Sequence, residues 1–119
     1  MKTPEVIAAL SALAHEHRLA IYRLLIERGP EGLPAGVVGE RVGLLPSSLT
    51  FHLQTLQRAG LITSQRISRR LIYSVDFDAM NGVIGYLTEN CCTASGAERS
   101  VACAPARSPK APKGAAKAA

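Results

Sequence analysis

The chain of 119 residues is long enough for one domain with a tail, and its composition, 47% hydrophobic but only 4% aromatic, predicts a core of aliphatic side chains. No apolar run approaches the roughly 18 residues that cross a bilayer. The first residues also lack the basic-then-apolar order of a signal peptide. From these features we expect a cytoplasmic protein with no membrane partner.

The net charge of +5 is unevenly distributed along the chain. Residues 104–119 carry four basic side chains and no acidic one, which leaves ten basic and nine acidic residues for the rest. Within that rest, residues 41–75 contain no acidic side chain. Their basic residues are Arg41, Arg58, Arg66, Arg69 and Arg70. Local positive charge of this kind is typical of surfaces that bind the phosphates of nucleic acids.

Two helices are expected at the beginning of the chain. Thr3 as a cap and Pro4 in the first turn predict the first one. Its apolar stripe comprises Val6, Leu10 and Leu13. Residues 15–28 predict a second helix, and residues 29–32 (GPEG) end it. Its apolar residues are Leu19, Ile21, Tyr22, Leu24, Leu25 and Ile26. Because they cover most of the circumference, we expect this helix at the centre of the domain.

Residues 34–60 predict a helix-turn-helix. A short helix over residues 34–42 is followed by Gly43, which allows a tight turn. The second helix starts with Pro46 in its first turn and ends before Gly60. Its apolar stripe is Leu49, Leu53 and Leu56, and its expected outer face carries Ser47, Ser48, Thr50, Phe51, His52, Gln54, Thr55 and Arg58. Short hydrogen-bonding side chains with few charges are suited to contacts with bases and phosphates in a DNA major groove.

After Gly60 the apolar period changes from 3.6 to 2, which predicts a β-hairpin. The expected strands are residues 61–67 and 70–75, with Arg69 and Arg70 at or beside the tip. A hairpin directly after a recognition helix is a wing that can reach the DNA backbone or the minor groove. The alternative is a solvated hairpin whose arginines have no partner.

The sequence predicts one last helix, over residues 77–90 and capped by Asp76. Its apolar side is Phe77, Met80, Val83, Ile84 and Leu87. A small domain cannot easily cover two apolar terminal helices, so we expect a homodimer formed by the first and last helices that binds pseudo-palindromic double-stranded DNA. The expected fold class is mainly α with a β-hairpin (α+β), a winged helix-turn-helix. Residues 1–92 form the DNA-binding and dimerisation domain, and residues 93–119 form a flexible basic tail rich in Ala, Pro and Lys.

Three segments together resemble the ArsR/SmtB family of metal-responsive transcriptional repressors. They are LAHEHRLAIYRLL at 13–25, SSLTFHLQTLQRAGLI at 47–62 and RRLIYSV at 69–75, and the resemblance extends over residues 5–92. It implies a dimeric regulator that binds its operator when metal-free and releases it on binding a toxic metal or metalloid. The recognition-helix pattern of the family falls on Ser47, Ser48, Thr50, Phe51 and His52 of this chain.

The chain departs from the family at its sensor positions. The Cys-Val-Cys arsenic motif that many members carry before the recognition helix is absent from residues 33–43, and the last helix lacks the histidines of a zinc site. Ser68 occupies a wing-tip position where glycine is frequent. Phe51 stands where a polar or basic residue is often found, and its ring suits contact with a thymine methyl group.

The remaining sensor candidates are Cys91, Cys92 and Cys103. An odd number of clustered cysteines argues against a disulfide framework and for a thiol or metal role. Trivalent arsenic and antimony bind three thiolates in a pyramid. The adjacent pair supplies two of them, and Cys103, at most about 36 Å further along an extended chain, supplies the third. Because this arrangement resembles an arsenite-responsive branch of the family, we expect As(III) or Sb(III) as the inducer and no organic cofactor.

Other functions are also compatible with the sequence. The thiols suit a redox switch, in which peroxide rather than arsenite releases DNA. Zinc bound by three thiolates and one imidazole requires His15, His17 or His52 nearby, whereas an organoarsenical requires only two thiols. A constitutive architectural DNA-binding protein would respond to no metal. The chain has no Cys-x-x-Cys, Gly-rich phosphate loop or nucleophile–base pair, so we expect no enzyme.

Overall fold

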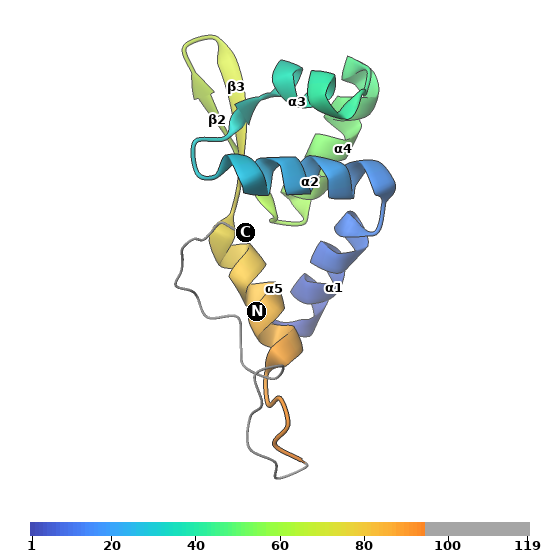
Figure 1. The fold of residues 1–119 in the computed structure, drawn as a ribbon, viewed down its shortest axis with the longest axis vertical. Coiled ribbons are helices and arrows are strands. Elements are labelled where there is room, and N and C mark those ends of the chain that lie inside the picture. The colour runs from blue at the N-terminus through green and yellow to red at the C-terminus, as the bar shows by residue number, and fades with distance from the viewer. Residues whose placement is uncertain (95–119) are drawn as a thin grey trace. The chain divides into compact units, whose positions relative to one another are not determined.

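A computed structural model describes residues 1–94 as five helices and a three-stranded antiparallel sheet (Figure 1). In chain order the elements are α1 (Thr3–Leu13), α2 (Glu16–Arg28), β1 (Leu33–Pro34), α3 (Ala35–Val42), α4 (Pro46–Arg58), β2 (Ile62–Ile67), β3 (Arg70–Val75) and α5 (Phe77–Thr88). Met1–Val83 form one compact unit, and a second unit begins at Ile84 within α5. The expected winged helix-turn-helix fold is confirmed. The expected tail and its Cys103 lie outside the described residues, apart from Thr93 and Ala94.

Helix α1 begins one residue earlier than the sequence predicted. Lys2 is the N-cap, and its backbone N–H donates to the Glu5 carboxylate at 2.7 Å. Because this carboxylate satisfies the N–H of the capping residue, Thr3 is already the first helical residue. The prediction that Thr3 caps α1 is therefore wrong, whereas Pro4 does lie in the first turn.

The buried side of α1 also differs from the expected stripe. Val6 is buried as predicted, but its buried companions are Ala9 and Ala12, while Leu10 is 41% exposed. Small side chains on the inner side allow α1 to pack closely on α2 and α4, which it contacts. The larger Ile7 and Leu10 are left on the exposed side of the helix.

Helix α2 lies at the centre of the first unit, as predicted, and contacts α1, α3, α4 and β3. Ile21, Tyr22 and Leu25 are its buried residues. Leu19 is 45% exposed, so the prediction that apolar residues bury most of the circumference is only partly correct. The helix is amphipathic because its other face, including Arg23 and Glu27, is solvated.

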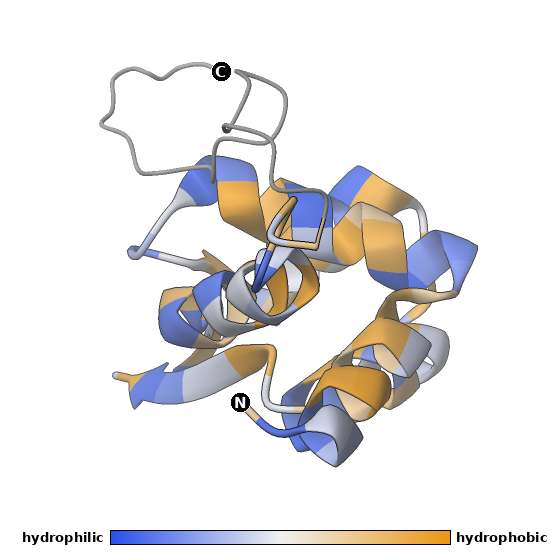
Figure 2. Cartoon of the chain, turned by 90° about the horizontal axis from the view of Figure 1, so that it is seen from below, coloured by the Kyte–Doolittle hydropathy of each residue, from blue (hydrophilic) through white to orange (hydrophobic). Residues whose placement is uncertain are grey.

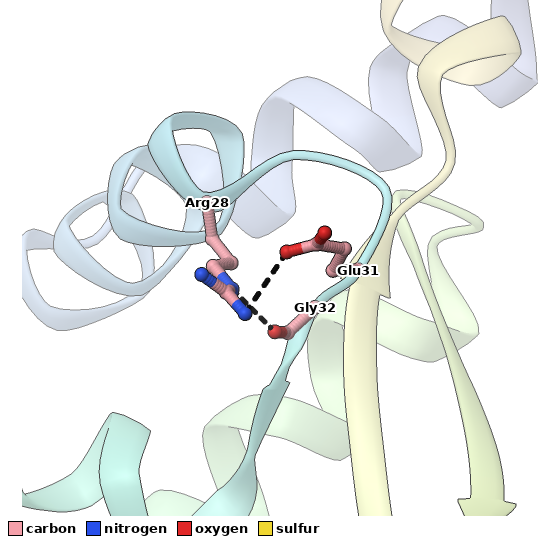
Figure 3. A network of polar contacts seen from close by, with 3 residues as sticks. All are labelled: Arg28, Glu31 and Gly32. Atoms are coloured by element: carbon pink, nitrogen blue, oxygen red, sulfur yellow. Dashed lines mark hydrogen bonds and ion pairs between the residues drawn. The ribbon is translucent and has the colours of Figure 1, made fainter.

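The short strand β1 connects α2 to the helix-turn-helix and was not predicted. Leu33 pairs with Tyr73 and Pro34 with Ile72, so β1 extends the hairpin into a sheet of order β1-β3-β2. Arg28 holds the preceding loop by donating Nε to the Gly32 carbonyl at 3.1 Å and pairing with Glu31 at 2.9 Å (Figure 3). Two residues are too few to show an alternating pattern in the sequence.

Helix α5 begins as expected and ends early. The Asp76 carboxylate accepts a hydrogen bond from the backbone N–H of Ala79 at 3.2 Å, which confirms the predicted cap. The helix ends at Thr88 rather than Asn90, because Asn90 has a φ of 61° that a helix cannot continue.

Figure 2 shows hydrophobic and hydrophilic residues on the same helices throughout the described part. None of the helices within residues 1–94 is long and apolar enough to cross a membrane.

Candidate nucleic-acid interface

Helices α3 and α4 are joined by a tight turn that depends on two glycines. Gly43 ends α3 in the left-handed conformation, and its N–H donates to the Gly39 carbonyl at 2.9 Å. Gly39 is buried, and a Cβ there would lie 3.1 Å from Leu49 Cδ2. The two helices therefore approach each other closely at this point, and the predicted turn at Gly43 is confirmed.

Helix α4 buries one face and exposes the opposite one. Leu49, Leu53 and Leu56 are at most 4% exposed, which confirms the predicted stripe. The exposed residues of the expected outer face are Ser47, Ser48, Thr50, Phe51, Gln54 and Arg58. Phe51 is 59% exposed, which confirms its predicted place on the outer face, although aromatic rings are more often buried. The exposed face thus combines hydroxyls, an amide, one arginine and one aromatic ring.

The first turn of α4 is open to solvent. Pro46 is the first helical residue and has no N–H, and the capping residue Leu45 makes no side-chain hydrogen bond to the helix. Both Ser47 and Ser48, the next two residues, are exposed. Backbone N–H groups at such a helix end attract anions, including phosphate.

His52 does not lie on the outer face, and that part of the prediction is wrong. Its side chain is only 8% exposed, and its Nδ1 lies 3.2 Å from Nη1 of Arg18 in α2. Burial lowers the pKa of His52 from its usual value, and His15, Arg18 and His17 lower this pKa further. A histidine at this depth supports the recognition helix from behind and is not placed to contact DNA.

The hairpin of β2 and β3 forms the predicted wing. The register pairs Ile62 with Val75 and Ile67 with Arg70, leaving Ser68 and Arg69 as a two-residue loop. Ser68 has a φ of 57°, and a positive φ at the first loop residue alone matches a type II′ turn. The exposed arginines of the wing are Arg66, Arg69 and Arg70. The wing tip and the start of α4 lie at the same end of the first unit (Figure 1).

The adjacent cysteines lie in a turn after α5. Their Sγ atoms are 3.4 Å apart, well beyond the roughly 2.05 Å of a disulfide, and both residues are partly exposed. Cys92 has a φ of 67°, and the N–H of Cys91 donates to the Thr88 carbonyl at 3.1 Å. Within residues 1–94 no three His, Cys, Asp or Glu side chains are grouped to hold a metal ion. The predicted three-thiolate site is therefore not tested, because Cys103 lies outside the described residues.

Comparison with solved structures shows the same fold. An ArsR-like transcriptional regulator from Rhodococcus sp. RHA1 superposes with a TM-score of 0.68 at 22% identity, covering 78% of this chain and 85% of that one. The homodimeric winged helix-turn-helix DNA-binding domain of Mb0332 from Mycobacterium bovis superposes with a TM-score of 0.60 at 19% identity. That match covers 82% of this chain and 88% of that one.

Sequence comparison establishes the family. Residues 13–65 match a model described as a helix-turn-helix domain. The HTH-type transcriptional regulator YgaV from Escherichia coli K12 is 35% identical over 88 residues, which cover 74% of this chain and 87% of YgaV. The chain belongs to the family of HTH-type transcriptional regulators that includes YgaV, and its fold is the winged helix-turn-helix of ArsR-like structures. It is a transcriptional regulator with a helix-turn-helix DNA-binding domain.

In this regulator, the sequence analysis did not predict the role of Arg18, which lies close to α4. Arg18 lies four positions before Tyr22 and seven before Leu25, on the face of α2 that is buried. Helical periodicity therefore contained a signal for it, namely a charged residue in line with two core residues. Arg18 is half-buried, and a charge removed from solvent needs a partner; its partners are in α1 and α4.

The two faces of α4 predict opposite responses to truncation. Leu53→Ala removes a side chain that is 1% exposed, so it should lower the free energy of unfolding by about 2–5 kcal/mol. Phe51→Ala removes an exposed ring and should change this free energy by less than about 0.5 kcal/mol. Urea denaturation followed by circular dichroism measures both. A large loss of stability in Phe51→Ala would contradict the outward orientation of its ring.

Proposed function

We propose that this regulator is a homodimeric repressor that binds pseudo-palindromic DNA and releases it when trivalent arsenic or antimony binds its cysteine thiolates. The observation that supports DNA binding is the exposed surface of α4 and the wing, which has no acidic side chain of its own. The observation that carries the inducer half is the separation of 3.4 Å between the Sγ atoms of Cys91 and Cys92. The thiols bind the inducer and perform no catalytic turnover.

In the proposed complex α4 lies in the major groove. Its open first turn, with Ser47 and Ser48, meets a phosphate or a base edge. Gln54 suits a bidentate contact with adenine, and the Phe51 ring suits the methyl group of thymine. Thr50 and Arg58 complete the surface, and Arg69 and Arg70 of the wing contact the backbone or the adjacent minor groove.

The terminal helices support a dimer. Ile7 and Leu10 of α1 are 57% and 41% exposed, and Ile84 and Leu87 of α5 are 38% and 61% exposed. Large aliphatic side chains that remain exposed on two helices of one small chain are typical of an interface between subunits. The solved Mb0332 domain is described as homodimeric, which supports the same assembly for this chain. A two-fold dimer presents two copies of α4 to two half-sites about one helical turn apart.

The geometry of the adjacent thiols suits a soft metalloid ion. Two thiolates bound to a tetrahedral zinc ion at about 2.3 Å lie roughly 3.8 Å apart. The Sγ atoms of Cys91 and Cys92, 3.4 Å apart, are close enough to bind one pyramidal As(III) or Sb(III) ion together. Cys103 supplies the third thiolate, from the same chain or from the partner. Because thiolates are the ligands, the affinity for the inducer falls with acid.

Inducer binding acts on DNA through the dimer. The thiols follow the last turn of α5, and that turn carries the exposed Leu87 of the proposed interface. Capture of the metalloid fixes this segment in an arrangement that gives the two recognition helices an unsuitable spacing. Coupling of this kind is typically worth about 1–3 kcal/mol, or roughly 5–150-fold in DNA affinity.

Salt dependence tests the DNA half. Arg69→Ala should weaken binding to all duplex sequences and reduce the slope of log affinity against log salt by about 1, because one phosphate contact is lost. Lys2→Ala, which removes one charge at the start of α1, is the control and should leave the slope unchanged. Fluorescence anisotropy on a duplex selected by the wild-type chain measures both, with two chains expected per site. Equal slopes for wild type and Arg69→Ala would contradict the role of the wing.

Arsenite titration tests the inducer half. Cys91→Ser and Cys92→Ser should bind the duplex as tightly as the wild type, but arsenite should no longer release them, since each loses one of the three ligands. Cys103→Ser should respond in the same way. Release that persists in Cys91→Ser and Cys92→Ser would contradict the assignment.

A peroxide titration of the same duplex complex distinguishes the redox alternative. If peroxide releases the wild type and arsenite does not, the adjacent thiols form a redox switch instead. The DNA half of the proposal is measured separately by the salt titration, so it does not depend on this outcome.

A further inference from the structure

Arg18 connects three helices through one guanidinium group. Its Nε donates to the carbonyl of Ala12 at 2.6 Å, and its Nη1 lies 3.2 Å from Nδ1 of His52. Ala12 lies in the last turn of α1, Arg18 in the first turn of α2, and His52 in the middle of α4. A single side chain thus bridges the end of α1 and the back of the recognition helix.

The contact with α1 satisfies a group that the helix itself leaves unpaired. The last four carbonyls of a helix have no intrahelical partner, and Ala12 contributes one of them. Its neighbours Ser11 and Leu13 accept from the backbone N–H groups of Ala14 and His15. Arg18 brings a positive charge to the negative end of the helix dipole, which is a favourable arrangement.

The contact with α4 determines the protonation state of His52. Arginine can only donate hydrogen bonds, so Nδ1 of His52 must accept, and the ring is neutral with its proton on Nε2. The ring is 8% exposed, so a second charge beside the guanidinium would be poorly solvated. Within the described residues the groups that act electrostatically on this ring are His15, His17 and Arg18. The ring centroids of His15 and His17 lie 4.6 and 5.8 Å from that of His52.

We propose that Arg18 is the positioning residue of the recognition helix: it holds neutral His52 and thereby fixes the polar face of α4 relative to the end of α1. This inference rests on the proposed DNA contacts of α4. The residues proposed to contact DNA lie directly around this anchor, since Phe51 precedes His52 and its ring packs edge-on against the imidazole with centroids 5.5 Å apart. A shift of His52 therefore moves Phe51.

This arrangement makes DNA binding sensitive to acid. The pKa of His52 in the folded protein is lowered, first by burial, so the unfolded chain binds more protons than the folded chain just below the ordinary pKa of about 6.5. The contribution of neutral His52 to the stability of the folded protein is complete above a pH of about 6.5. It is lost as the pH falls toward the lowered pKa, because a protonated Nδ1 repels the guanidinium instead of accepting from it.

Variants of Arg18 and His52 test the proposal. Their affinity for a duplex selected by the wild-type chain is measured between pH 7.5 and 5.5 at constant ionic strength. Arg18→Ala should reduce the affinity at pH 7.5 about tenfold or more, since a charged hydrogen bond is lost. Arg18→Lys should restore part of this affinity, because its single nitrogen keeps the positive charge but cannot take the places of both Nε and Nη1.

The pH profile separates positioning from a merely structural role. His52→Gln can still accept from Arg18 through Oε1 but does not titrate, so its affinity should fall less on acidification than that of the wild type. His17→Gln, which removes a nearby imidazole without touching the Arg18 contact, is the matched control. It should still lose affinity on acidification, with the loss moved to slightly higher pH, because His17 no longer lowers the pKa of His52. Nitrogen NMR at pH 7.5 should show His52 unprotonated at Nδ1 and protonated at Nε2.

Three results would overturn the proposal. These are a folded Arg18→Ala that binds the duplex like the wild type, a His52→Gln that loses as much affinity on acidification as the wild type, and a His52 protonated at Nδ1 at pH 7.5. If Arg18→Ala fails to fold, the profile of His52→Gln decides, because that variant keeps the guanidinium and its contact with α1.

Discussion

The burial of Leu49, Leu53 and Leu56 is the constraint on which the rest of this structure depends. These side chains occupy one face of α4, pack against the helices beneath it and leave less than 5% of their surface exposed. Side chains on the opposite side of the helix, such as Phe51 and Gln54, must then point outward, because a helix separates neighbouring residues by about 100°. The polar face proposed to contact DNA is thus a consequence of core packing, and rotating α4 to hide that face would expose three leucines.

The same core sets the position of α4 relative to the other helices. Apolar contacts are non-directional and tolerate small rotations, whereas the hydrogen bonds of Arg18 to Ala12 and His52 have fixed geometry. Packing therefore provides the stability of the unit, and this polar contact at its centre specifies orientation. α1 is also one of the two helices proposed to form the dimer. The contact consequently lies on the path from the subunit interface to the DNA-binding surface.

Much of this arrangement was predictable from the sequence where periodicity is strong and long. The stripe of α4, the two strands of the hairpin and the Asp76 cap each follow from side chains within one element, and each is confirmed. The predictions that were wrong concern how one element packs against another. Ala9 and Ala12 face inward in place of Leu10 because α1 lies close to its neighbours, and His52 faces inward because Arg18 of another helix meets it. The two-residue strand β1 exists only because β3 pairs with it.

The most direct test of the account is an NMR titration of the isotope-labelled chain with the duplex it selects. Amide signals of Ser47, Ser48, Thr50, Phe51 and Gln54, together with those of residues 66–70 in the wing, should shift most on binding. Signals from the exposed side of α1, such as Ile7 and Leu10, should shift little. Shifts concentrated on α1, with α4 and the wing unaffected, would contradict the claim that the buried stripe of α4 orients its opposite face toward DNA.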